Sequence, residues 1–287
     1  MYQVLIAHDL TERSTFALAD AADIALDRES HLTILHVVDS GLSSQVFEAH
    51  RHQAKGHLEV EVRRLASHTV LPHRIEVVAG DPAEEIAAQA LARSIDLVVV
   101  GRHRRRPIAD MFRGTTVERL LRQVRRPVLV VNKRSQLSRR RMLIPIDFSD
   151  ASKVSIRFAA ALFPEAALHL FHAYTGPFQD YIAALTLTFS RAEKAKFAGS
   201  LGEHAEQAMA RFIDGLGLDP GRIAATVRNG DTAALIKEEL ERQEMDLLVM
   251  GTHARSGIAR ALIGSVAEAA LNSSDCNILV VPVPDGA

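Results

Sequence analysis

The sequence predicts an α/β protein built from two tandem copies of one domain, each a five-stranded parallel sheet of nucleotide-binding (Rossmann-like) type with helices on both faces. Short apolar runs alternate with segments of helical periodicity along all 287 residues. The same order of runs occurs twice, and a polar, basic segment, residues 132–141, separates the copies. The predicted domains are therefore residues 1–137 and 138–287.

Each copy contains its strand candidates in the same order. The first strand ends in an aspartate, Asp9 or Asp147, and the fourth ends at a glycine, Gly101 or Gly251. Continuous runs of Val, Ile and Leu are typical of parallel strands that are buried on both faces. The expected strands are 4–9, 32–37, 74–80, 97–100 and 128–131 in the first copy, and 142–147, 168–173, 224–230, 247–250 and 278–281 in the second.

Helical patterns fill the intervals between the strands. The expected helices are 15–26, 46–65, 82–93 and 116–124 in the first copy, and 153–162, 193–216, 232–242 and 266–271 in the second. Pro82 stands in a first helical turn, where proline is favoured. Strands that alternate with helices imply right-handed crossovers, and ligands of such sheets bind beyond the carboxyl ends of the strands. The ends of the predicted strands therefore converge on one edge.

The second copy contains an insertion, Gly176 to Gly199, that the first copy lacks. Its aromatic residues, Phe178, Tyr181, Phe189 and Phe197, are expected to lie in the core. The alternative is a cover or partner surface over the ligand edge, because the insertion follows the second strand.

Composition excludes several classes of protein. With 47% apolar residues and a net charge of −1, the chain has the composition of a globular protein and not that of a nucleic-acid binder. Its one cysteine, Cys276, permits no internal disulfide framework and indicates a reducing compartment. The N-terminal residues lack the pattern of a signal peptide, and no apolar run reaches the ~20 residues of a membrane span. We therefore expect a cytoplasmic protein with no membrane or nucleic-acid partner.

A glycine-containing loop follows the fourth strand of each copy and leads into a helix. The first loop runs from Gly101 to Gly114-Thr115, and the second from Gly251 to Gly264-Ser265. The first turn of a helix has unpaired N–H groups and the positive end of the helix dipole, which favour a phosphate. Taken alone, either loop is better explained as a plain strand end and helix start, but their repetition at one spacing favours a phosphate site. Neither loop matches the P-loop or the GxGxxG pattern.

These loops resemble the nucleotide motif of the universal stress protein family, which is Gly, two residues, Gly, nine residues, then Gly with Ser or Thr. Both copies depart from the motif at its second glycine, where Arg104 and Ala254 stand. The resemblance implies an intramolecular pseudo-dimer, because each domain of the family would otherwise dimerise through its last strand. It also implies ATP as the ligand, with or without Mg²⁺.

The resemblance also implies a set of binding residues in each copy. In the second copy, Asp147 accepts hydrogen bonds from the adenosine portion, and the base and phosphates contact Pro145, Ala173, Gly251, His253, Ala254, Gly264, Ser265 and Val266. The matching residues of the first copy are Ala7, Asp9, Val37, Gly101, His103, Gly114, Thr115 and Thr116. The alternative role for Asp9 and Asp147 is to cap the helix that follows, and both roles are compatible.

The departures from the motif favour the second copy as the better nucleotide site. If the second glycine needs a positive φ, alanine there costs roughly 1 to 2 kcal/mol, or about tenfold in affinity. Arg104 adds a long side chain to the same cost. Its loop is strongly basic, through Arg102, Arg105, Arg106 and Arg113, so the first site is either lost or suited to a more anionic ligand.

The sequence indicates a binding protein and not an enzyme. No P-loop lysine, Ser/His/Asp arrangement or metal cluster is recognisable by spacing, and His103 and His253 are expected to position phosphates. The leading hypothesis is a stress-response regulator that binds an adenine nucleotide. The alternative is a nucleotide-free scaffold that acts through protein contacts. The protein partners, and a homodimer of the tandem chain, stay open.

Overall fold

The computed structural model describes residues 2–66, 69–102, 115–134, 140–174, 191–251 and 276–282, with the side chains of 191–199 excepted. These residues form two compact units. The described part of the first unit comprises the residues up to 134 together with 276–282, and that of the second comprises 140–251. The last strand of the second repeat therefore belongs to the first unit.

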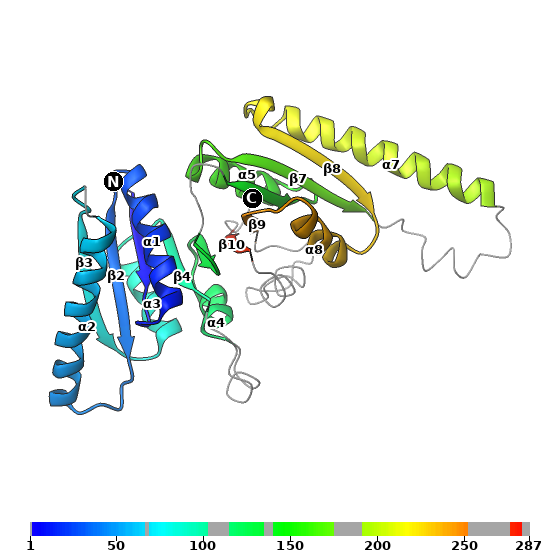
Figure 1. Cartoon of the computed structure of the whole chain (residues 1–287). Helices are drawn as coiled ribbons and strands as arrows, with labels where there is room; N and C mark the ends of the chain where they lie inside the picture. Colours follow the sequence, from blue (N-terminus) through cyan, green and yellow to red (C-terminus); the bar gives the residue numbers. More distant parts are fainter. Residues whose placement is uncertain are drawn as a thin grey trace. The chain divides into compact units, whose positions relative to one another are not determined.

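The first unit is a sheet with helices on both faces (Figure 1). Its strand order is β3-β2-β1-β4-β5-β10. The pairs among β1 to β5 are parallel, whereas β10 pairs antiparallel with β5. Helices α1 and α2 pack together on one side, and α3 packs on α4. The strands are β1 (Gln3–Ala7), β2 (His31–Val38), β3 (His73–Ala79), β4 (Leu97–Gly101), β5 (Val128–Val131) and β10 (Asn277–Val281). The helices are α1 (Glu12–Asp27), α2 (Ser44–Leu65), α3 (Pro82–Ala92) and α4 (Thr116–Gln123).

The second unit repeats this arrangement with the strand order β9-β6-β7-β8, whose pairs are all parallel. The long helix α7 runs beside β8 in Figure 1. The strands are β6 (Arg141–Pro145), β7 (Ala167–Tyr174), β8 (Ile223–Asn229) and β9 (Leu247–Gly251). The helices are α5 (Asp150–Leu162), α7 (Arg191–Asp214) and α8 (Thr232–Arg242), with a short 3₁₀ turn at Pro220–Arg222.

Local sequence explains where these elements begin. Asp81 and Asp231 cap α3 and α8 by accepting backbone N–H groups of the first turn, and Pro82 occupies the first position of α3. Asp96 and Asp246 accept the N–H of the first residue of β1 and β6, respectively. Valine, leucine and isoleucine of β1 and β4 are almost wholly buried, as expected of central parallel strands. The same polar anchors thus recur in both repeats.

In both units the strand order reverses between the first and fourth strands of the repeat: β1 lies between β2 and β4, and β6 lies between β7 and β9. This reversal is the point at which doubly wound sheets bind ligands, beyond the carboxyl ends of the strands. Asp9 and Gly101 follow or end the strands at the reversal in the first unit, and Asp147 and Gly251 do so in the second. The fold thus presents repeated polar positions at one edge of each sheet.

The predicted fold class is confirmed: strands and helices alternate, the sheet is mostly parallel, and the pattern occurs twice. Within the first unit the last strands of the two repeats, β5 and β10, pair antiparallel; the pseudo-dimer arrangement stays a prediction. Helix α1 begins at Glu12, three residues before the expected start at Thr15. The core prediction for Phe178, Tyr181, Phe189 and Phe197, and the expected helix 266–271, lie outside the described residues or side chains. The boundary between residues 137 and 138 stays a prediction.

Candidate functional site

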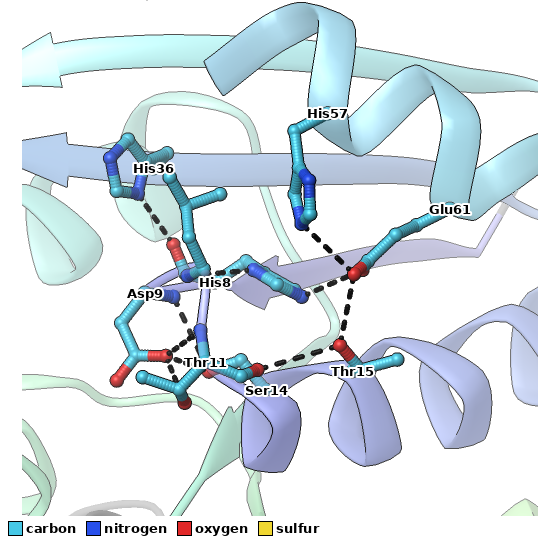
Figure 2. Close-up of polar contacts among 9 residues, drawn as sticks. His8, Asp9, Thr11, Ser14, Thr15, His36, His57 and Glu61 are labelled. Carbon is cyan, nitrogen blue, oxygen red and sulfur yellow. Dashed lines mark hydrogen bonds and ion pairs between the residues drawn. The ribbon is translucent and has the colours of Figure 1, made fainter. Parts of the chain in front are cut away.

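The candidate site of the first unit begins at the turn between β1 and α1. One carboxylate oxygen of Asp9 accepts hydrogen bonds from the backbone N–H and hydroxyl of Thr11 and from the hydroxyl of Ser14 (Figure 2). The N–H of Asp9 in turn donates to the Ser14 hydroxyl at 3.3 Å. The carboxylate is therefore fixed in direction by the turn that follows it, at the exposed edge of the sheet.

The second unit has the same turn. One oxygen of Asp147 accepts the N–H and hydroxyl of Ser149 and the hydroxyl of Ser152, and the Asp147 N–H donates to the Ser152 hydroxyl at 3.2 Å. Leu10 and Phe148, the residues after the two aspartates, have φ values of 63° and 64°. A left-handed conformation is costly for such side chains and is concentrated at functional sites. Both repeats retain it at the same place.

The alternative, that Asp9 and Asp147 cap the following helices, is wrong, because other residues occupy the N-cap positions. The N-cap positions are Thr11 and Ser149, each two residues later. The Ser149 side chain accepts the first-turn N–H of Ser152, whereas that of Thr11 makes no such bond. The aspartates brace the turn before each cap, because an Asp side chain readily accepts the N–H two residues on. This role is compatible with a second, outward contact.

A buried histidine distinguishes the first turn from the second. The side chain of His8 is fully buried, and its Nε2 lies 3.2 Å from a carboxylate oxygen of Glu61 on α2. The other Glu61 oxygen lies 3.1 Å from Nε2 of the half-exposed His57 and accepts the Thr15 hydroxyl at 3.1 Å. Figure 2 shows this row of side chains beside the Asp9 turn. In the second repeat Ile146 replaces His8, so that row has no counterpart.

The hydrogen bond at Nδ1 of His8 defines the protonation state of the ring. Its Nδ1 lies 3.0 Å from the backbone N–H of Leu10 and must accept that hydrogen, so the ring carries its own proton on Nε2 toward Glu61. Burial lowers the pKa of His8 below its usual 6.5, against the opposing charges of Glu61 and Asp9. A neutral His8 thus holds the left-handed residue Leu10 in place.

A second histidine is common to both repeats. Nδ1 of His36 lies 2.7 Å from the carbonyl oxygen of His8, and Nδ1 of His172 lies 2.8 Å from that of Ile146. A carbonyl only accepts, so each ring donates from Nδ1. In the second unit the ring of Phe148 also lies against His172, with centroids 4.2 Å apart. The end of each first strand is therefore tied to the neighbouring strand by an imidazole.

The other described residues of the predicted site lie at the same strand ends. Ala7, Val37, Gly101, Pro145, Ala173 and Gly251 are all partly exposed. A Cβ on Gly101 would lie 3.1 Å from the backbone oxygen of Arg13 in α1. The close approach of α1 therefore explains why glycine occupies this position, independently of any ligand. Strand pairing brings these positions together at one edge in each unit, and their role in binding stays a prediction.

The first turn of α4 shows how the predicted Thr115 is used. The Thr115 hydroxyl accepts the N–H of Glu118 at 3.2 Å, and the Glu118 carboxylate accepts the N–H of Thr115 at 3.0 Å. In this capping box the hydroxyl is an acceptor, so its hydrogen can be donated to a phosphate oxygen, whereas the Thr115 N–H is engaged. Thr116 is exposed.

Helix α4 is also held from its side. Arg119 donates two hydrogen bonds of 2.8 Å to the two oxygens of Asp81, the cap of α3. This hydrogen-bonded pair lowers the pKa of Asp81. The orientation of α4 thus depends on α3.

The remaining predicted site residues lie outside the described residues. They are His103, Gly114, His253, Ala254, Gly264, Ser265 and Val266. The structure therefore describes the aspartate turns and strand ends of the predicted site. Within that described part, no group of three or more His, Cys, Asp or Glu side chains is arranged to hold a metal ion. Among the described helices, none is long and apolar enough to cross a membrane.

Ser14 and Ser152 were missed by the interpretation of the sequence, although each fixes an aspartate of the site. Their signal is present in both repeats as Asp, one residue, Thr or Ser, two residues, Ser. His36 and His172 stand at matching strand positions and give a second repeated signal. A polar residue that recurs at the same offset from a strand-ending aspartate is therefore informative.

Comparison with known proteins gives concordant matches. The model of the universal stress protein family matches residues 1–132 and 138–282. The chain is 24% identical to a universal stress protein of Mycolicibacterium smegmatis over 293 residues, which cover 98% of this chain and 97% of that one. A crystal structure of a functionally unknown protein from Pseudomonas aeruginosa PAO1 is similar, with a TM-score of 0.70 at 19% identity, covering 98% and 92% of the two chains. A universal stress protein from Archaeoglobus fulgidus DSM 4304 has a TM-score of 0.69 at 16% identity, covering 99% of this chain and 97% of that chain. At such identities the structural likeness shows the fold alone.

Proposed function

The chain belongs to the universal stress protein family as a tandem member, and from that premise we propose that it is a cytoplasmic stress-response regulator that binds an adenine nucleotide. The observation that carries the proposal is the braced aspartate at the point of strand reversal, present in both units. A carboxylate fixed at this edge suits the polar hydrogens of an adenosine, because ligands of doubly wound sheets bind there.

The described residues fit such a ligand. In the second unit Asp147 is partly exposed and held by the hydroxyls of Ser149 and Ser152, so a ligand would meet a carboxylate whose direction is already set. Pro145 and Ala173 offer partly exposed apolar surface for a base beside it. ATP, with or without Mg²⁺, would place its phosphates at the loop after β9, where the family motif requires Gly264 and Ser265.

We assign the tighter site to the second repeat. Ala254 replaces the second motif glycine there with the smallest side chain, whereas the first repeat has Arg104. In the first repeat, His8, which contacts Glu61, also replaces the apolar Ile146 of the second repeat. Binding, and not turnover, is the proposed activity, with His103 and His253 as positioning groups.

Calorimetric titration of the full chain with ATP tests the proposal. The repeats supply a matched pair of variants, Gly264→Val and Gly114→Val, which add the same bulk at equivalent loop positions. We expect Gly264→Val to lower the affinity of the tighter site at least about tenfold, equal to ~1.4 kcal/mol. Gly114→Val should leave that site intact. Equal effects of the two variants would contradict the assignment to the second repeat.

A second function is favoured by the substituted glycines. With Arg104 and Ala254 in place of glycine, neither loop has the full family motif. A nucleotide-free scaffold that acts through protein contacts would tolerate both substitutions. Absence of heat at millimolar ATP in the wild-type chain would favour this scaffold and reject the nucleotide proposal.

A further inference from the structure

The edge of β5 is covered by β10, the last strand of the second repeat. The two strands are antiparallel, with Leu129 opposite Leu279 and the pairs Val130–Ile278 and Val128–Val280 on either side. Val128 and Ile278 occupy equivalent positions in the two repeats, so this register places Leu129 and Leu279 at the centre of a symmetric pair. The same register would therefore also pair β5 with β5, or β10 with β10, of a second copy of the chain.

One end of the pair is held by buried amide side chains. The Asn277 side chain is fully buried, and its oxygen accepts the backbone N–H groups of Asn132 at 2.8 Å and Lys133 at 3.1 Å. Its NH₂ group donates to the carbonyl oxygen of Lys133 at 3.0 Å. The Asn132 side chain returns a bond of 2.6 Å to the carbonyl oxygen of Cys276. Asn277 thus hydrogen-bonds to the backbone of the two residues that follow β5.

The Asn277 amide also reaches α1. Its NH₂ group lies 3.5 Å from a carboxylate oxygen of Asp20, a side chain that is fully buried in α1. A buried amide or carboxylate without its partners costs far more than its hydrogen bonds gain, so this cluster strongly favours the one arrangement that satisfies it.

At the other end of the pair the flanking positions hold different residues. Pro127 stands at the position of Asn277, and Pro282 at the position of Asn132. Proline has neither a backbone N–H nor an amide side chain. The native pair therefore has both asparagines, which are hydrogen-bonded to each other, at one end and both prolines at the other.

Neither self-pairing reproduces this arrangement. In a β10–β10 pair, Asn277 would face Pro282 at both ends and would lose the N–H that Asn132 supplies. In a β5–β5 pair, the N–H of Asn132 would face Pro127 at both ends, with no amide to accept it. Each self-pairing therefore loses, at both ends, the hydrogen bond between the Asn132 N–H and the Asn277 oxygen that the native pairing makes.

We propose that Asn277 and Asn132 make the β5 edge selective for a β10 strand, so that the partner it fits is this chain's own last strand and not the equivalent edge of a second copy. Selectivity arises from what the wrong pairing leaves unsatisfied, which is a common means of specifying a partner. The inference rests on the strand pairing and does not depend on nucleotide binding.

Disulfide trapping in the full chain tests this selectivity. A Leu279→Cys variant, with Cys276→Ser to remove the native thiol, forms a covalent dimer through β10 only when β10 pairs with β10, because Leu279 would then face its own copy. Leu129→Cys reports β5–β5 pairing in the same way. The rate of dimer formation under mild oxidation is read on a non-reducing gel.

In the Leu279→Cys chain we expect slow trapping. Asn277→Ala should raise the rate at least about tenfold, since it removes the side-chain bonds that favour the native pair. Lys133→Ala is the matched control, because Lys133 contributes only backbone atoms to the cluster. Its rate should equal that of the parent.

Pro282→Ala keeps the proposal testable if Asn277→Ala does not fold. This variant retains the native bonds of Asn277 and supplies an N–H at position 282, so the β10–β10 pair gains an acceptable partner. Trapping should rise, although less than with Asn277→Ala. Fast trapping in the parent, or rates for both variants equal to that of Lys133→Ala, would overturn the proposal.

Discussion

Replacement of His8 by asparagine should reduce the acid sensitivity of the fold. The His8 ring is fully buried and neutral, with Nδ1 accepting the Leu10 N–H, and burial lowers its pKa below 6.5. The titratable groups that face it are Glu61, Asp9, His36 and His57. Asparagine retains an oxygen that can accept the Leu10 N–H, but it does not titrate.

The magnitude follows from proton linkage. Because the folded pKa is lowered, the unfolded chain binds the extra proton first, and stability falls as the pH drops below the unfolded value of 6.5. If folded His8 stays neutral, the free energy of unfolding falls by about 1.4 kcal/mol between about pH 7.5 and 5.5. The loss stops only when the pH reaches the folded pKa. His31 and His169 also have lowered pKa values, but they are unchanged in the variant and cancel in the comparison.

Urea denaturation at a series of pH values measures this difference. The wild-type chain should lose about 1.4 kcal/mol more than His8→Asn over that range. His57→Gln, which alters only the half-exposed end of the row, is the control and should retain most of the wild-type slope. Parallel stability curves for wild type and His8→Asn would refute the assignment of a neutral, buried His8.

Four further variants test other parts of the structure. Gly101→Ala should lower the free energy of unfolding by about 1 to 3 kcal/mol, because the new Cβ meets the backbone of α1. Gly56→Ala should instead raise it by about 0.5 to 1 kcal/mol in the same urea titrations, because no atom lies within 4 Å of the new Cβ in α2. Asp81→Ala should cost about 1 to 2 kcal/mol through loss of the α3 cap and of Arg119. Since the pKa of Asp81 is lowered, its contribution to stability is present above about pH 4 and is lost as the pH falls below that value. The variant should therefore be less stable than the wild type above about pH 4, and its free energy of unfolding should fall less steeply in acid. Glu239→Gln should cost about 1 to 3 kcal/mol by thermal unfolding, because this fully buried carboxylate pairs with Arg242 at 2.7 Å; an unchanged melting temperature would contradict that pairing.

The sequence predicted the features that depend on local pattern. The strands before Asp9 and Asp147 were expected, although each ends two residues earlier, at Ala7 and Pro145. The helices that begin at Pro82 and Thr116 were also expected, because apolar periodicity and capping residues act within a few positions. Repetition of each pattern in the second half strengthened every assignment.

The features that depend on tertiary contact were not predicted. The pairing of Asn277 with Asp20 joins residues 257 positions apart, and no local pattern indicates it. The His8–Glu61 contact joins a strand to a distant helix, and its meaning depends on a burial that the sequence does not state. The hydrogen bonds from Ser14 and Ser152 to the aspartates could have been predicted, since both repeats have a serine five residues after the aspartate.

Mass spectrometry of the small molecules released from the purified full-length chain tests the central claim, nucleotide binding at the strand-reversal edge, most directly. The account predicts an adenine nucleotide among the released molecules, present for the wild-type chain and absent for Gly264→Val. A wild-type chain that releases no nucleotide, even after incubation with millimolar ATP and rapid desalting, would contradict it.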